Sequence, residues 1–128
     1  MKREVIETNQ APAAIGPYVQ GVRMENMLFT SGQLGIDVST GKLEEGIARQ
    51  THMCMKNIGH ILRKVGASYK NVVKATIFLQ DLADFAEVNT IYGSYFEGDY
   101  PTRSCVEVAS LPLNALVEIE TISMLEVD

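Results

Sequence analysis

The sequence of 128 residues is poor in the residues that build metal sites, with only two histidines and two cysteines. Cys54 and Cys105 form no Cys-x-x-Cys pair. The two histidines, His52 and His60, are eight residues apart with Lys56 between them, which favours solvated side chains over a metal pair. The composition therefore argues against a zinc site.

Long apolar runs are also absent. No stretch approaches the roughly 20 apolar residues that are needed to span a bilayer. The first ten residues, MKREVIETNQ, lack the apolar segment of a signal peptide. From these two absences we expect a cytoplasmic protein that does not associate with a membrane.

Positive charge is scarce. Eleven Lys and Arg residues stand against sixteen Asp and Glu residues, which gives a net charge of −5. The densest basic cluster is only Arg63-Lys64, and no basic run or aromatic-basic motif is present. Because nucleic-acid binding depends on clustered cations that neutralise phosphates, the sequence argues against a nucleic-acid partner.

What the chain does contain is typical of one globular domain that spans residues 1–128. Its 46% hydrophobic and 21% charged residues are ordinary values, and this length buries a core without disulfides or metals. Alternating apolar patterns predict strands, and apolar spacings of three and four predict helices. The predicted strands cover residues 4–8, 18–24, 27–31, 71–80, 102–108 and 116–124, and the predicted helices cover residues 44–65 and 84–96.

This order, β-β-β-α-β-α-β-β, predicts an α+β fold with a mixed, mainly antiparallel sheet and both helices on one face. Residues 25–26 are the expected hairpin turn, where Asn26 tolerates a left-handed backbone. In the first helix, Cys54 lies on the apolar stripe as a small core residue, and Gly66 is a suitable helix stop. Residues 84–87 resemble a capping box at the start of the second helix.

The most promising chemistry lies between residues 100 and 120, which read YPTRSCVEVASLPLNALVEIE. Side chains two apart on a strand share one face, so Arg103 should point the same way as Cys105, and Glu118 the same way as Glu120. Arg103 is the best carboxylate or phosphate clamp in the chain, because its planar fork binds two oxygens at once. The alternative, which the spacing leaves equally open, is an ion pair with Glu107 or another acid.

The other groups of this stretch also allow two interpretations. Cys105 beside a guanidinium could be a nucleophile, but a structural or substrate-lining thiol is preferred because no histidine base is near in sequence. Glu118 or Glu120 could position and deprotonate a water molecule, or could simply face solvent.

Further candidates come from three other segments. The irregular loop APAAIGP ends at Tyr18, whose hydroxyl is available to a site. Ser31 and Gly32 stand at a strand end, where a glycine allows a close backbone approach, although a turn without a ligand is the preferred interpretation from these residues alone. Asn89 lies on the apolar side of the second helix, where it either binds a loop carbonyl, as is slightly preferred, or lines a site.

Several segments together resemble the YjgF/RidA family of reactive-intermediate deaminases. They are AIGPYVQGV at 14–22, FTSGQLGID at 29–37, FAEVNTIYGSYF at 85–96 and PTRSCVEVASLPLNALVEIE at 101–120. The resemblance covers essentially the whole chain in order. It implies a chorismate-mutase-like fold, assembled as a homotrimer with the sheets in a central barrel and the sites between subunits.

The resemblance also implies an activity: cofactor-free hydrolysis of 2-imino acids, such as 2-iminopropanoate (from 2-aminoacrylate) and 2-iminobutanoate, to 2-keto acids and ammonia. The implied roles are a carboxylate clamp for Arg103, contacts to the imino end for Cys105 and Gly32, a water-holding role for Glu118, and pocket-lining positions for Tyr18, Ser31 and Asn89.

Two residues depart from the family pattern. Val19 stands where the family often has Ser, and Gly35 where it often has Pro. The resemblance therefore does not determine the shape of the pocket. Two other functions stay open as well. One is a non-catalytic, regulatory protein that binds keto acids, which the presence of Arg103 disfavours. The other is an endoribonuclease or translation inhibitor, which the acidic balance disfavours.

Overall fold

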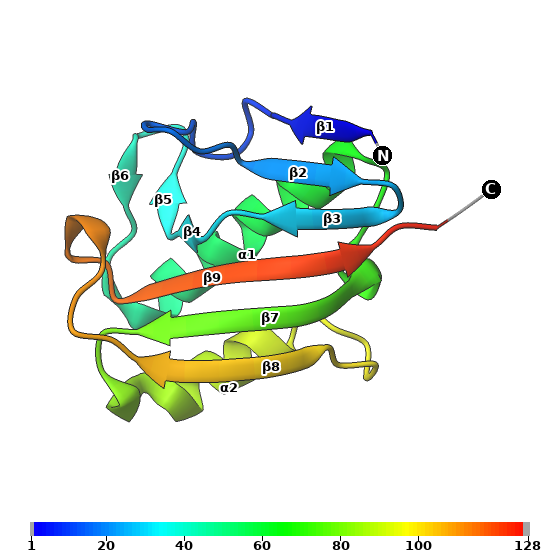
Figure 1. Ribbon diagram of the computed structural model, residues 1–128. Coiled ribbons are helices and arrows are strands. Elements are labelled where there is room, and N and C mark those ends of the chain that lie inside the picture. The colour runs from blue at the N-terminus through cyan, green and yellow to red at the C-terminus, as the bar shows by residue number, and fades with distance from the viewer. Residues whose placement is uncertain (1, 127–128) are drawn as a thin grey trace.

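A computed structural model describes residues 2–126 of the chain. One mixed sheet has the strand order β1-β2-β3-β9-β7-β8, and the short β4 also pairs with β9. Figure 1 shows both helices behind this sheet, on one face. The strands are β1 Arg3–Ile6, β2 Gly21–Met24, β3 Met27–Thr30, β4 Gln33–Leu34, β5 Ile36–Asp37, β6 Lys42–Leu43, β7 Val72–Leu79, β8 Thr102–Glu107 and β9 Val117–Met124, and the helices are α1 Gly46–Lys64 and α2 Phe85–Gly93.

The predicted α+β class, mixed sheet and one-sided helices are confirmed. All strand pairs are antiparallel except β7 with β8, which are parallel because α2 carries the chain back between them. The β5–β6 hairpin was not predicted from the sequence. Three short 3-10 turns, Tyr69–Asn71, Leu82–Asp84 and Pro112–Asn114, complete the order of elements.

The apolar stripe of α1 packs on the sheet as its periodicity predicts. Cys54, Ile58, Ile61 and Leu62 are fully buried, together with the inward side chains of β7 and β9. The helix ends at Lys64, and the predicted stop, Gly66, follows it with a left-handed φ of 76°. There, the Gly66 and Ala67 N–H groups donate to the last carbonyls of the helix in a Schellman arrangement.

Two polar side chains on the buried side of α1 bind its surroundings, a role that the apolar spacing of the helix does not predict. The Gln50 amide donates to the Glu44 carbonyl (3.0 Å), and its Oε1 accepts from the Leu116 N–H (2.9 Å). Asn57 donates to the carbonyls of Leu34 (3.1 Å) and Ile36 (3.0 Å). These bonds fix β4, β5 and the approach to β9 against the helix.

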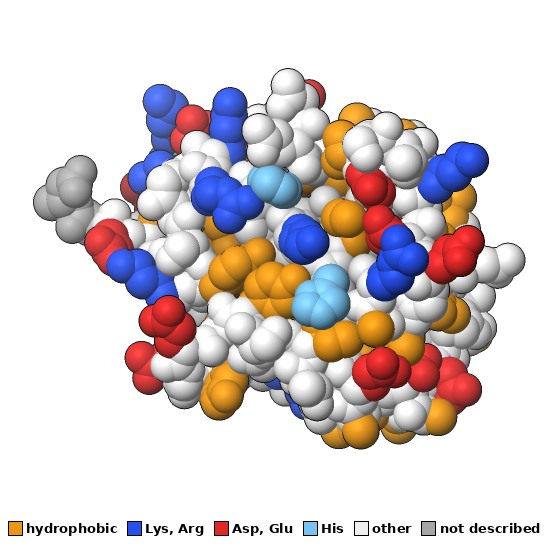
Figure 2. Space-filling view, turned by 180° about the vertical axis from the view of Figure 1, so that it is seen from behind, with side chains coloured by type: hydrophobic (Ala, Val, Ile, Leu, Met, Phe, Trp, Pro, Cys, Tyr) orange, Lys and Arg blue, Asp and Glu red, His pale blue; other side chains and the backbone are white. Residues whose placement is uncertain are grey.

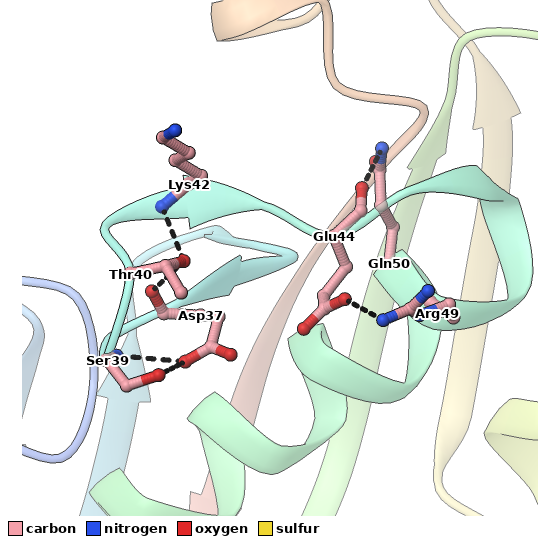
Figure 3. Close-up of polar contacts among 7 residues, drawn as sticks. All are labelled: Asp37, Ser39, Thr40, Lys42, Glu44, Arg49 and Gln50. Carbon is pink, nitrogen blue, oxygen red and sulfur yellow. Dashed lines mark hydrogen bonds and ion pairs between the residues drawn. The ribbon is translucent and has the colours of Figure 1, made fainter.

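The start of α1 differs from the prediction, because the helix begins at Gly46 and not at residue 44. Instead, the Glu44 carboxylate pairs with Arg49 at 3.0 Å (Figure 3). In the adjoining hairpin, the Asp37 carboxylate accepts from both the N–H and the hydroxyl of Ser39, and these bonds hold the pKa of Asp37 below its usual value.

The second helix and the hairpin turn also differ from the sequence-based prediction. α2 ends at Gly93 and not at residue 96, and the Asp84 side chain makes no cap. The cap lies earlier, where the Asp81 carboxylate accepts from the Ala83 N–H (2.9 Å). In the hairpin turn, Glu25 and not Asn26 takes the left-handed backbone (φ 55°).

Figure 2 shows the helix face, where the two histidines stand apart with a basic side chain between them. The His52 Nδ1 lies 2.8 Å from the Tyr95 hydroxyl, and the His60 Nδ1 lies 2.8 Å from an Arg63 nitrogen. Within residues 2–126, no group of three or more His, Cys, Asp or Glu residues is placed to hold a metal ion. No helix in this range is long and apolar enough to cross a membrane.

A substitution at Gly35 tests the close contact between this residue and the backbone of α1. A Cβ at this position would lie 2.6 Å from both the Cα and the carbonyl oxygen of Gln50, which are backbone atoms that cannot move aside cheaply. We therefore expect Gly35→Ala to lower the free energy of unfolding by about 2–3 kcal/mol in urea denaturation. Gly93→Ala is the matched control, since its Cβ would meet only a Tyr100 side-chain atom at 3.9 Å. Equal effects of the two substitutions would contradict the proposed contact.

Candidate active site

A cleft of about 1280 Å³ opens beside β4 and the first part of β9. Its walls are the irregular loop before β2, the segment from Ser31 to Leu34, and the turn before β9. Of the predicted site residues, four lie in this cleft: Tyr18, Ser31, Gly32 and Glu118, joined by the second candidate acid, Glu120.

The Glu118 carboxyl group lies directly over Gly32. A Cβ on Gly32 would be 2.8 Å from the Glu118 Cδ and 2.9 Å from its Oε1, so the absence of a side chain at position 32 makes room for the carboxyl group. Glu118 is half-buried, and burial, followed by the nearby charge of Glu120, raises its pKa above the usual value. Such a carboxyl group takes up a proton from a water molecule more readily than an ordinary glutamate does.

A buried amide that the sequence analysis missed holds the loop that forms one wall of the cleft. Gln20 accepts from the Thr8 N–H (2.7 Å) and donates to the carbonyls of Thr8 (3.0 Å), Ala11 (3.1 Å) and Pro12 (2.8 Å). These bonds hold the Gln20 side chain against the loop, and β2 begins at Gly21 and not at Tyr18 as predicted. A glutamine in a predicted strand does not indicate that its side chain will hydrogen-bond a loop twelve residues earlier in the chain.

The two hydroxyls predicted for the site differ in their availability. The Ser31 hydroxyl donates to the Val19 carbonyl at 2.5 Å, so it fixes the loop beside the cleft. Tyr18 is half-exposed, and its hydroxyl accepts only a long bond, 3.5 Å, from the Ile15 N–H. The Tyr18 hydroxyl is therefore the freer of the two toward a ligand.

Arg103 lies outside this cleft, on the edge strand β8. Its guanidinium donates to the Asn89 Oδ1 and lies over two rings of α2, 5.3 Å from the Phe85 centroid and 5.6 Å from the Tyr92 centroid. The alternative ion pair with Glu107 or another acid is wrong, because neither ion pair of the described chain involves Arg103. The Glu107 carboxylate instead accepts from the Leu82 N–H (2.8 Å). Asn89 likewise binds the arginine in place of the loop carbonyl that was slightly preferred.

Cys105 packs against the core beside Arg103. Burial raises the pKa of its thiol, and the Arg103 charge offsets this only in part. The thiol is therefore protonated at neutral pH and is a poor nucleophile, which favours a structural or substrate-lining thiol over a nucleophile.

Strand register separates the predicted residues into two groups. In β8, Arg103 and Cys105 pair with Ala75 and Ile77, which are buried under the helices. In β9, Glu118 pairs with Phe78 on the opposite face. Within one chain, therefore, the arginine and the glutamate do not converge.

The turn before β9 adds a wall residue that the sequence did not single out. Leu113 takes a left-handed φ of 59°, and its side chain stands 64% exposed at the cleft. Leucine seldom adopts this backbone conformation, and such outliers gather at functional sites.

Comparison with known proteins gave consistent matches over the whole chain. The profile of a family described as endoribonuclease L-PSP matches residues 8–125. A protein of Arabidopsis thaliana named reactive intermediate deaminase A, chloroplastic, is 51% identical, over 98% of this chain and 67% of its own. A mouse protein named 2-iminobutanoate/2-iminopropanoate deaminase is 46% identical, over 95% and 91%. The crystal structure of Escherichia coli TdcF with bound serine superposes with a TM-score of 0.93 at 42% identity, over 96% and 99%.

The paired acids of the cleft lead to a direct prediction. Glu120→Gln removes a like charge near Glu118, so we expect the pKa of Glu118 to fall toward its ordinary value. Following the carboxyl carbon of Glu118 by NMR as the pH is varied measures this. Glu97→Gln, which removes an exposed charge at the end of α2, should leave the titration unchanged. An unaltered Glu118 pKa in Glu120→Gln would mean that burial alone causes the shift.

Proposed function

Because the chain belongs to the YjgF/RidA family, we propose that it hydrolyses reactive 2-imino acids to 2-keto acids and ammonia. Substrates of this class include 2-iminopropanoate and 2-iminobutanoate, the compounds for which the mouse relative is named. The observation that carries the proposal is Arg103, a guanidinium that engages no carboxylate of the described chain and lies on an edge strand next to a neutral thiol. The cytoplasm is the location that we propose, although the Arabidopsis relative is named as chloroplastic.

The reaction needs no covalent nucleophile from the protein, because an imino carbon is already a strong electrophile. Arg103 clamps the substrate carboxylate, while Glu118 orients a water molecule against the imino carbon. The water oxygen forms a bond to that carbon while one water proton passes to nitrogen through Glu118, which gives a tetrahedral intermediate. The remaining hydroxyl proton then passes to nitrogen by the same carboxyl group as the C–N bond breaks, which releases ammonia and leaves the keto group. Tyr18, Cys105 and the Gly32 backbone line the path of the substrate.

This arrangement requires residues from two chains, since Arg103 and Glu118 lie on opposite faces of one sheet. We propose a homotrimer in which three sheets pack as a chorismate-mutase-like barrel, and in which each site combines the cleft of one subunit with β8 and α2 of its neighbour. The helix-free face of the sheet supports this assembly, because Val5, Phe29 and Met124 are 46%, 39% and 38% exposed there. A second copy would bury these side chains.

The proposed clamp predicts the outcome of a coupled assay in which threonine or serine dehydratase generates the imine. We expect the protein to accelerate keto-acid formation and Arg103→Ala to lose this acceleration by about 100-fold, because the carboxylate is no longer held. Arg49→Ala, which removes a mostly exposed arginine on α1, is the matched control and should retain full acceleration.

Three results, from this assay, from keto-acid binding and from an RNA-cleavage assay, would count against the proposal. Full acceleration by Arg103→Ala would contradict the clamp. Tight binding of a keto acid without acceleration by the unaltered protein would favour the regulatory alternative. RNA cleavage that persists through stringent purification and is lost in Arg103→Ala would favour the ribonuclease.

The shared site predicts complementation between inactive variants. Light scattering should give three times the mass of one chain. Arg103→Ala and Glu118→Gln should each be inactive, but co-expressed subunits should regain activity, because roughly one site in four then has both native residues. Co-expression of two differently tagged Arg103→Ala chains is the control and should stay inactive. A monomeric mass, or a mixture as inactive as its components, would rule out the shared site.

A further inference from the structure

One face of α2 forms a seat for the guanidinium of Arg103. Phe85, Asn89 and Tyr92 follow one another at spacings of four and three, so their side chains lie on the same side of the helix. All three contact Arg103: the amide accepts a hydrogen bond, and the two rings lie 5.3 and 5.6 Å from the guanidinium carbon. We call these three residues the Arg103 seat.

Every contact in the seat is uncharged. In the described part of the chain, the ion pairs join Glu44 to Arg49 and Lys70 to Glu126, and neither involves Arg103. The Asn89 oxygen takes one of the five N–H donors of the guanidinium. Aromatic faces attract a cation through their quadrupole without cancelling its charge. The seat therefore restricts the arginine while leaving its charge and most of its donors unused.

The ring of Tyr92, and not its hydroxyl, serves this contact. Tyr92 is only 4% exposed, and its buried hydroxyl has no hydrogen-bond partner among the residues that the structure describes. Burial raises the pKa of that hydroxyl to about 12, so no phenolate forms to pair with Arg103 at neutral pH. The only group that could supply a negative charge to the seat is thus neutral.

We propose that the Arg103 seat is a positioning device that holds the guanidinium by neutral contacts alone, so that its full charge is available to the substrate carboxylate. Phe85, Asn89 and Tyr92 are positioning residues, and the amide at position 89 sets the affinity because a carboxylate there would compete with the substrate. The inference rests on the proposed role of Arg103 as the clamp.

The test compares Asn89→Asp with Thr90→Asp. Both add one negative charge to α2, but Thr90 is exposed and outside the seat. Pyruvate, the keto acid expected from 2-iminopropanoate, is the probe, and its dissociation constant is measured by calorimetry or NMR. We expect Asn89→Asp to weaken pyruvate binding roughly tenfold or more, because the new carboxylate pairs with Arg103, and Thr90→Asp to leave it unchanged.

Thermal unfolding separates positioning from a merely structural role. Asn89→Asp should keep or raise the Tm while binding falls, since the new ion pair is itself favourable, whereas a structural defect would lower both together. At the ring positions, Phe85→Leu should weaken pyruvate binding several-fold, and the conservative Phe85→Tyr should restore it.

The controls distinguish failure of this inference from failure of the proposed function. If Arg103→Ala abolishes pyruvate binding but Asn89→Asp binds like the unaltered protein, the neutral seat is overturned and the clamp stands. If Arg103→Ala binds pyruvate normally, the clamp itself is overturned, and the seat with it. A parallel loss of Tm and binding in Asn89→Asp would also overturn the inference, because the amide would then be structural.

Discussion

The alternation of side chains along β8 and β9 is the constraint on which the rest of the site depends. Neighbouring residues of a strand point to opposite faces, so the register with β7 places Arg103 under the helices and Glu118 on the helix-free face. No rotation of either side chain crosses the sheet. A reaction that needs both residues must therefore draw them from two copies of the chain, and the exposed apolar side chains of the helix-free face provide a surface on which such copies can meet.

Close backbone approaches build the cleft around Glu118. Gly32 leaves room for the Glu118 carboxyl group, and Gly35 lets the chain pack against the backbone of α1. The Gln20 amide hydrogen-bonds the loop before β2, which forms another wall of the cleft. These contacts pack segments that are distant in sequence closely against one another. The departure of Gly35 from the family pattern thus has a structural basis in this protein, since no larger residue fits beside Gln50 without displacing the helix.

The two groups that we propose for the reaction lie in opposite electrostatic environments. Glu118 is partly withdrawn from water and faces Glu120, so it holds a proton more readily than an ordinary glutamate. Arg103 is surrounded by an amide and two rings, which fix its position and leave its charge unpaired. A base that can take up a proton and a cation that can bind a carboxylate are what the hydrolysis of a 2-imino acid requires.

The sequence by itself determined the main strands and helices, the buried stripe of α1, and the residue types able to bind a carboxylate or activate water. These features follow from local periodicity and side-chain chemistry, which any short window of sequence contains. The tertiary structure alone decided that Asn89 binds Arg103 and that Gln20 hydrogen-bonds the loop before β2. It also decided that Arg103 and Glu118 lie on opposite faces of the sheet. The reason is that each depends on strand register or on contacts between distant segments, and neither is encoded in the spacing of residues along the chain.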